Sequence, residues 1–139
     1  MALDEAEGRE PEPEQGGTPD AAVRLRAGAR LFDEARYEEA HEELEHVWLA
    51  SEGGDADFFK GLIQAAICLH HFQRGNLAGA RRLYSGHRRY LGAYLPRHRA
   101  VDVEAFLADM QAFLRPVLRA TADARVPFER DRRPRLRIG

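Results

Sequence analysis

Histidine and carboxylate side chains lie close together in the segment 38–45 of this 139-residue chain. His41 is the only histidine in that segment, and Glu45 follows it four residues later. In an α-helix, residues four apart lie on the same side, one turn from each other. An imidazole next to a carboxylate could transfer protons, or could supply two of the nitrogen and oxygen ligands that divalent metals bind.

A second set of polar residues interrupts the most apolar part of the chain, residues 57–74. These residues fall within roughly 80° of one another around a helix: Lys60, Gln64, His71 and Arg74. A polar stripe on an otherwise buried helix must be hydrogen-bonded, because a buried unpaired polar group costs about 1–3 kcal/mol. We expect carboxylates of the preceding helix to be its partners. The predicted binding cluster consists of His41, Glu42, Glu45, Trp48, Gln64 and His71.

Three interpretations of this cluster are open. Its hydrogen bonds could simply fix the register of two helices. Alternatively, His41, Glu45 and His71 could hold a divalent metal in a hydrolase-like enzyme. The third is metal-free acid–base catalysis. We favour a ligand- or partner-binding domain, and we predict no particular reaction, substrate or cofactor.

Five helices are predicted to position these residues. Apolar residues at spacings of three and four, bounded by proline, glycine and capping residues, indicate helices over residues 19–35, 37–50, 57–74, 77–95 and 102–116. Pro96 is expected to close the fourth, and Pro116 to kink or end the fifth. No strand is predicted. The fold class is therefore all-α, a single-domain bundle of antiparallel helical hairpins.

The two ends of the chain have opposite charge. Residues 1–20 carry seven carboxylates against the single Arg9, so we predict a disordered acidic tail over residues 1–18. The helical domain follows over residues 19–121. Residues 122–139 carry six arginines against three carboxylates, and are predicted to form an irregular basic tail.

A weak repeat suggests a further class of function. Residues 31–40 resemble residues 71–80 at an offset of forty, as in helical-hairpin repeat proteins that serve as interaction adaptors. The fourth helix is also basic, through Arg81, Arg82, Arg88 and Arg89. A protein partner or a homo-oligomer is favoured over nucleic acid, because no nucleic-acid-reading motif accompanies these arginines.

The cysteine content and the hydropathy of the chain indicate where in the cell the protein is expected. Cys68 is the only cysteine, which excludes an internal disulfide and a Cys-based zinc site. No stretch is apolar and long enough for a transmembrane helix, and the acidic start differs from the basic start of a signal peptide. We expect a cytoplasmic protein with no membrane partner.

The chain resembles the family of small helical bacterial and archaeal proteins called domain of unknown function 309. The resemblance covers about residues 31–91, and this chain departs from it at Ala35, where the family usually has a glycine. Its motifs are Tyr37-Glu38-Glu39-Ala40-His41-Glu42-Glu43-Leu44-Glu45, Trp48, Phe59-Lys60-Gly61-Leu62-Ile63-Gln64-Ala65-Ala66, His71-Phe72-Gln73-Arg74-Gly75-Asn76 and Gly79-Ala80. The resemblance implies an all-α array with no established activity, and its motif positions include most of the predicted cluster.

Overall fold

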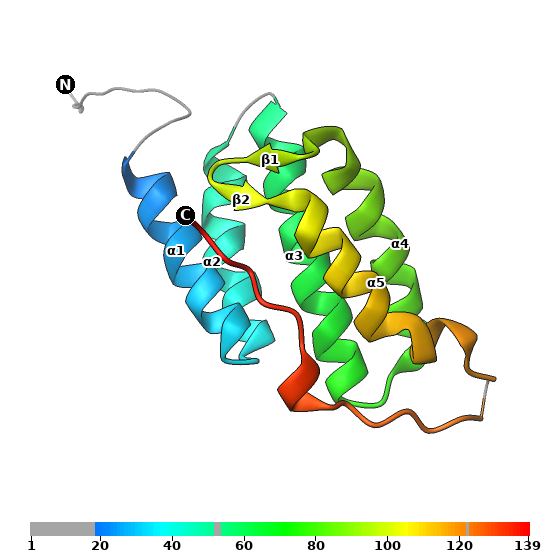
Figure 1. Ribbon diagram of the computed structural model, residues 1–139. Coiled ribbons are helices and arrows are strands. Elements are labelled where there is room, and N and C mark those ends of the chain that lie inside the picture. Colours follow the sequence, from blue (N-terminus) through cyan, green and yellow to red (C-terminus); the bar gives the residue numbers. More distant parts are fainter. Residues whose placement is uncertain (1–18, 52–53, 122) are drawn as a thin grey trace.

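A computed structural model describes residues 19–51, 54–121 and 123–139 of the chain (Figure 1). Within those ranges it confirms an all-α fold with five α-helices, two short 3₁₀ turns and one two-stranded hairpin. The predicted tail over residues 1–18 lies outside the described residues. The α-helices and strands are α1 (Pro19–Asp33), α2 (Tyr37–Ala50), α3 (Gly54–Gln73), α4 (Leu77–Leu91), β1 (Arg97–His98), β2 (Val101–Asp102) and α5 (Val103–Arg119).

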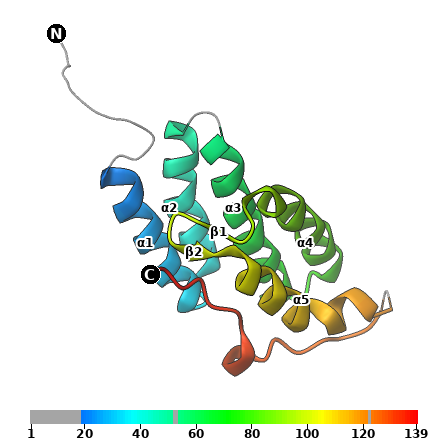
Figure 2. The same cartoon turned by 45° about the horizontal axis from the view of Figure 1, so that its top comes forward.

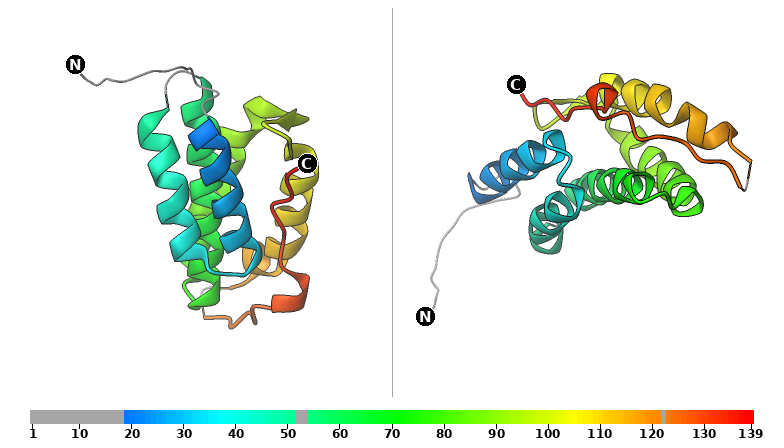
Figure 3. Two further views of the ribbon diagram at one scale, coloured as in Figure 1. Left: turned by 90° about the vertical axis from the view of Figure 1, so that its left-hand side faces the viewer. Right: turned by 90° about the horizontal axis from the view of Figure 1, so that it is seen from below.

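The first four helices form one curved layer. Each packs mainly against its neighbour in the sequence, α1 on α2, α2 on α3 and α3 on α4. The helices therefore follow one another across the layer as two antiparallel hairpins (Figure 3). The last helix, α5, and the C-terminal segment after it lie together on one side of this layer. The opposite side of α2, α3 and α4 carries no further element of the described chain.

The same turn joins the helices of both hairpins. After α1, the backbone N–H groups of Ala35 and Arg36 donate to the carbonyls of Phe32 and Leu31, at 2.9 Å each. Forty residues later the same two bonds recur at 3.0 and 2.8 Å, with Gly75 in the place of Ala35. Both residues are left-handed, with φ of 64° and 78°. These are Schellman turns, so the weak sequence repeat marks a real repeat of local structure.

Helix α3 lies at the centre of the core. Phe58, Phe59, Leu62 and Leu69 are at most 1 % exposed, which follows from their occurrence on nearly every side of the helix. Although α3 is 20 residues long, no helix in the described ranges is both long and apolar enough to span a bilayer. The burial of α3 positions α2, α4 and α5 around it.

Several helix ends differ from the sequence-based boundaries, among them the start of α3 at Gly54 and the C-terminal ends of α4 and α5. Helix α4 ends at Leu91 and is followed by a 3₁₀ turn over 92–94. It therefore ends before Pro96, the residue that was expected to close it. Helix α5 does not end at Pro116 but continues to Arg119. A proline there removes only one N–H donor from the last turn, and the fully buried Val117 holds that turn against the core.

The prediction of no strand was wrong for residues 97–102. Strands β1 and β2 pair through a two-residue turn in which Arg99 and Ala100 have φ of 49° and 63°. Such a turn usually contains Asn-Gly, so Arg-Ala gave no hairpin signal. Side chains hold it instead: Asp55 accepts a hydrogen bond from His98 Nε2 at 2.7 Å and from Arg99 Nη2 at 2.8 Å. The hairpin thereby reaches the end of the layer where α3 begins (Figure 2).

The C-terminal segment is irregular but packs against the core. It contains a 3₁₀ turn over 130–132 and one isolated bridge between Val101 and Ile138. The Phe128 ring lies 5.2 Å from the rings of Phe72 and Phe113, measured between centroids. Leu136 is 1 % exposed. These residues complete the core between α1 and α5.

His87 is the one buried polar residue of the core in the described chain. Its Nδ1 donates to the carbonyl of Tyr84, and its Nε2 has no hydrogen-bond partner. Burial lowers the pKa of His87 to about 4, and this effect is opposed in part by the bond to Tyr84. The imidazole is therefore neutral in the folded protein and acts as a packing residue.

The left-handed backbone at Gly75 generates the first prediction. A Cβ at this position would meet no atom within 4 Å, so Gly75→Ala tests backbone strain alone. We expect the free energy of unfolding to fall by about 1 kcal/mol. Gly92→Ala is the matched control, because Gly92 is also uncrowded but has φ of −59°. Urea denaturation of both variants measures the difference, and equal stability would contradict the assignment.

The burial of His87 generates a second prediction. Because its pKa is lowered on folding, the unfolded chain binds the proton first as the pH falls below about 6.5. The free energy of unfolding should therefore decrease by about 3 kcal/mol between pH 6.5 and pH 4 through this residue. Denaturation at several pH values measures this decrease in the free energy of unfolding. It should be absent in the variant His87→Leu and still present in His46→Gln, a change at an exposed histidine.

Candidate functional site

The predicted residues of α2 lie on its open side, away from α5. The Nε2 of His41 is 3.9 Å from Glu45 Oε1, so the expected proximity of these two residues is confirmed. Their side chains are 30 % and 44 % exposed, and Glu42 is exposed as well. The pair therefore sits at a solvated edge of α2. Trp48 follows one turn beyond Glu45 and is half-buried.

Lys60 joins three helices at one end of this surface. Its ammonium lies 5.8 Å from the centre of the Trp48 ring on α2 and 5.0 Å from that of the Tyr90 ring on α4. Cations in such positions are attracted by the negative faces of aromatic rings. Hydrogen bonds from Lys60 and Arg89 also lower the pKa of the Tyr90 hydroxyl. This arrangement places one cation between two aromatic rings that remain accessible.

Gln64 and His71 lie against α4. A Cβ added at Gly86 would overlap the side-chain oxygen of Gln64, and one added at Gly79 would come within 2.9 Å of the His71 ring. The two glycines therefore leave room for the polar side chains of α3. Because Lys60, Gln64 and His71 lie on one side of α3, the half-exposed strip that they form runs between α2 and α4.

The partner of His71 is an amide and not a carboxylate. Asn76 caps α4 through its Oδ1, which accepts from Gly79 N–H at 3.0 Å. Its Nδ2 must then donate to His71 Nδ1, 3.2 Å away, which places the single proton of the imidazole on Nε2. Partial burial lowers the pKa of His71, and the positive charges of Arg82, His70 and Arg74 lower it further.

Two arrangements considered from the sequence are not found in the described residues. No hydrogen bond joins Gln64 or His71 to a carboxylate of α2 in the described chain. In residues 19–51, 54–121 and 123–139, no three histidine, cysteine or acidic side chains are grouped so that they could hold a metal ion. The proposed ligand set of His41, Glu45 and His71 is thus not assembled. Helical periodicity predicted the angular position of each residue but not which neighbouring helix it would meet.

The basic face of α4 also divides into two kinds of arginine. Arg81 donates to the carbonyls of Val117 and Ala120 at 3.1 and 2.8 Å, and Arg88 donates to Leu107. These two side chains therefore hold α5. Arg82 and Arg89 are exposed and point away from α5. We name the open surface of α2, α3 and α4 the outer face; its residues are His41, Glu45, Trp48, Lys60, Gln64, Ile67, His71, Arg74, Arg82, Leu83, Arg89 and Tyr90.

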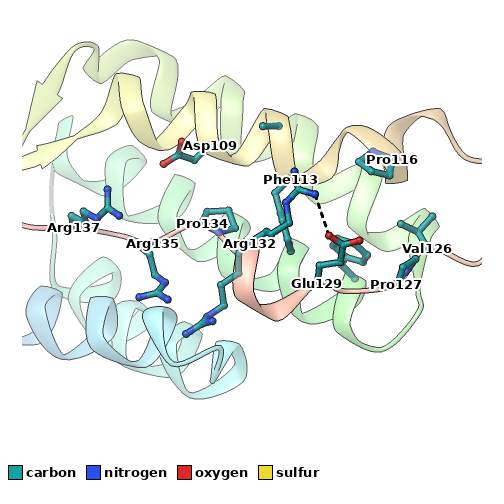
Figure 4. Close-up of a pocket in the computed structure, with 13 residues that line it drawn as sticks. Asp109, Phe113, Pro116, Val126, Pro127, Glu129, Arg132, Pro134, Arg135 and Arg137 are labelled. Carbon is teal, nitrogen blue, oxygen red and sulfur yellow. Dashed lines mark hydrogen bonds and ion pairs between the residues drawn. The ribbon is translucent and has the colours of Figure 1, made fainter.

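Sequence analysis missed a cavity on the other side of the molecule. It measures about 360 Å³ and lies between α5 and the C-terminal segment (Figure 4). Its walls combine arginines with apolar and aromatic side chains. The composition of residues 122–139 indicated a basic tail, but its return to α5 depends on the packing of Phe128 and Leu136 in the core.

A comparison with models of protein families gives a match. Residues 25–83 match the model of a family described as "Domain of unknown function (DUF309)". The matched range contains all six residues of the predicted cluster, together with Lys60, Gly79 and Arg82. A comparison with curated proteins finds no match.

The surroundings of His71 generate a third prediction. Replacing Arg82 by Gln removes a positive charge that disfavours the imidazolium, so the pKa of His71 should rise towards its ordinary value. Titration of the His71 ring protons by NMR measures the shift. Arg97→Gln, a change on β1, should leave the titration of His71 as it is. An unchanged or lower pKa in Arg82→Gln would show that the two side chains do not interact.

Proposed function

The chain belongs to the domain of unknown function 309 family through residues 25–83, and on this premise we propose that it is a partner-binding domain whose outer face recognises an acidic segment of another protein. The observation that carries the proposal is the position of Lys60 between Trp48 and Tyr90. Three helices contribute to that single point, so the folded layer and not one helix would define the binding surface.

The composition of the outer face supports a protein partner. Its apolar side chains are Trp48, Ile67, Leu83 and Tyr90, each half-buried, so that a partner could complete their burial. Aromatic residues are enriched in the cores of protein interfaces, where they pack against apolar groups of the partner. Polar groups with free hydrogen-bonding capacity, such as the amide of Gln64, lie between them.

The charge of the outer face supports an acidic occupant. No carboxylate of the described chain pairs with Lys60, Arg74 or Arg82, although all three lie on or beside the strip. A bound carboxylate near His71 would offset the neighbouring positive charges that lower the pKa of this residue. The partner would therefore be an acidic segment that also carries aromatic or aliphatic residues to contact Trp48 and Tyr90.

This proposal combines the binding-domain interpretation with the adaptor interpretation of the helical hairpins. It assigns His41 and Glu45 to the α2 edge of the surface and involves no catalytic step. We place the function in the cytoplasm, where a lone cysteine remains reduced; Cys68 is buried, and burial raises its pKa to about 12.

Selection from a random peptide library displayed on phage, with the full chain as bait, tests the proposal. Selected peptides should be rich in Asp or Glu together with Phe, Leu or Trp. Trp48 is the only tryptophan, so its fluorescence can measure the affinity of a synthetic selected peptide that itself lacks tryptophan. We expect Lys60→Gln with Arg82→Gln to weaken binding about tenfold, because two charge-assisted contacts are lost.

The control is Arg135→Gln, a change on the other side of the molecule, which should leave peptide affinity unchanged. Tyr90→Leu should weaken binding as well, because it removes one of the two rings beside Lys60. Peptides without acidic residues, or equal affinity in the wild-type and Lys60→Gln/Arg82→Gln proteins, would show that the proposal is wrong.

A further inference from the structure

The C-terminal segment is held in place by main-chain contacts. Arg133 donates to the carbonyl of Asp33 at the end of α1 through Nη2 and Nε, at 2.6 and 3.0 Å. The backbone N–H of Leu136 donates to Asp33 Oδ1 at 2.6 Å, and Arg97 Nη2 donates to the carbonyl of Gly139 at 2.8 Å. Both ends of the stretch 133–139 are therefore fixed to the rest of the fold.

This attachment leaves two arginines available for another role. Residues alternate in direction along an extended stretch, so the buried Leu136 directs Arg135 and Arg137 away from the core. Both guanidinium groups are exposed, and no carboxylate of the described chain forms an ion pair with either. They differ in this respect from Arg132, which pairs with Glu129 at 3.3 Å, and from Arg133, which donates hydrogen bonds to the end of α1.

The two arginines stand at the side of the cavity described above. Its other walls combine the apolar and aromatic side chains of Phe72, Phe113, Val126, Pro127 and Pro134 with the charged side chains of Glu129, Arg132 and Arg133. Asp109 of α5 lies across from the C-terminal segment (Figure 4). Arg135 and Arg137 also border a shallower hollow on the α1 side, to which Arg26 and Arg30 contribute. Positive charge therefore borders one edge of a cavity whose walls combine apolar and charged groups.

We propose that this cavity binds an organic phosphate, a small molecule in which a phosphate group is attached to an aromatic body. Arginine presents a planar set of N–H donors that matches phosphate oxygens, and two guanidinium groups can balance the charge of a phosphate dianion. The aromatic body would enter between Phe113 and the prolines. Asp109 would accept a hydrogen bond from a hydroxyl or amino group on that body.

The size of the cavity agrees with this class of ligand. A volume of about 360 Å³ is at the lower end of the range for small-molecule sites, which are largely apolar with a few polar groups that fix orientation. A nucleic-acid backbone would instead require a row of cations along an open surface. The enclosed position of the apolar walls between α5 and the C-terminal segment favours the small molecule.

Calorimetric titration of the full chain with phenyl phosphate tests the proposal. Inorganic phosphate, benzoate and benzyl alcohol separate the contributions of the phosphate, of charge in general and of the ring. Phenyl phosphate should bind more tightly than each of the three. The double change Arg135→Gln with Arg137→Gln should weaken its binding about tenfold or more.

Two further variants make the result specific. Ala112→Phe, at an exposed residue lining the cavity, should weaken binding of phenyl phosphate by filling the space without a change of charge. The double change Arg115→Gln with Arg119→Gln removes an equal charge from α5 and should leave the affinity for phenyl phosphate unchanged. The outer-face change Lys60→Gln should also leave this binding intact, so failure here and failure of the partner-binding proposal are distinguishable.

Several outcomes would overturn the inference. If the Arg115→Gln/Arg119→Gln control weakened the binding of phenyl phosphate as much as Arg135→Gln/Arg137→Gln does, the ligand would be attracted by net charge alone. If inorganic phosphate bound as tightly as phenyl phosphate, or if Ala112→Phe left the affinity for phenyl phosphate unchanged, the cavity would not bind an aromatic body. Tighter binding of a single-stranded 12-nucleotide DNA with a steep dependence on salt would identify the arginines as a nucleic-acid surface instead.

Discussion

The burial of α3 is the constraint on which the other features depend. Its apolar residues lie on nearly every side of the helix, and each apolar side needs a neighbour to exclude water. Helices α2, α4 and α5 supply those neighbours. The side that remains is the narrow polar strip of Lys60, Gln64 and His71. The outer face is thus the part of α3 that the hydrophobic core does not use.

The same constraint separates the two proposed sites. In a helix of 3.6 residues per turn, Leu69 projects about 180° away from Lys60. The core side of α3, which includes Phe72, meets α5 and the C-terminal segment, and the cationic cavity lies there. The polar strip faces the opposite way. A ligand on one side would therefore touch no residue that a partner touches on the other, and the packed aromatic core lies between them.

Local patterns predicted the site residues better than they predicted their contacts. The spacing of His41 and Glu45 was sufficient to make them neighbours, because both lie on one helix. The contact of His71 with Asn76 was not predictable in the same way, since it requires the turn at Gly75 to bring the start of α4 back onto α3. The hairpin at Arg99 and Ala100 was missed because its stability comes from Asp55, more than forty residues earlier, and not from turn-forming residues.

The sequence by itself determined the helices, their apolar sides and the two repeated turns, because these follow from interactions within a few turns of the chain. Only the tertiary structure decided how the helices meet, that α2 offers no carboxylate to His71, and that the arginines after residue 130 return to line a cavity beside α5. Contacts of this kind join residues up to 103 positions apart, such as Asp33 and Leu136. They depend on the geometry of the whole core, which periodicity along the chain does not encode.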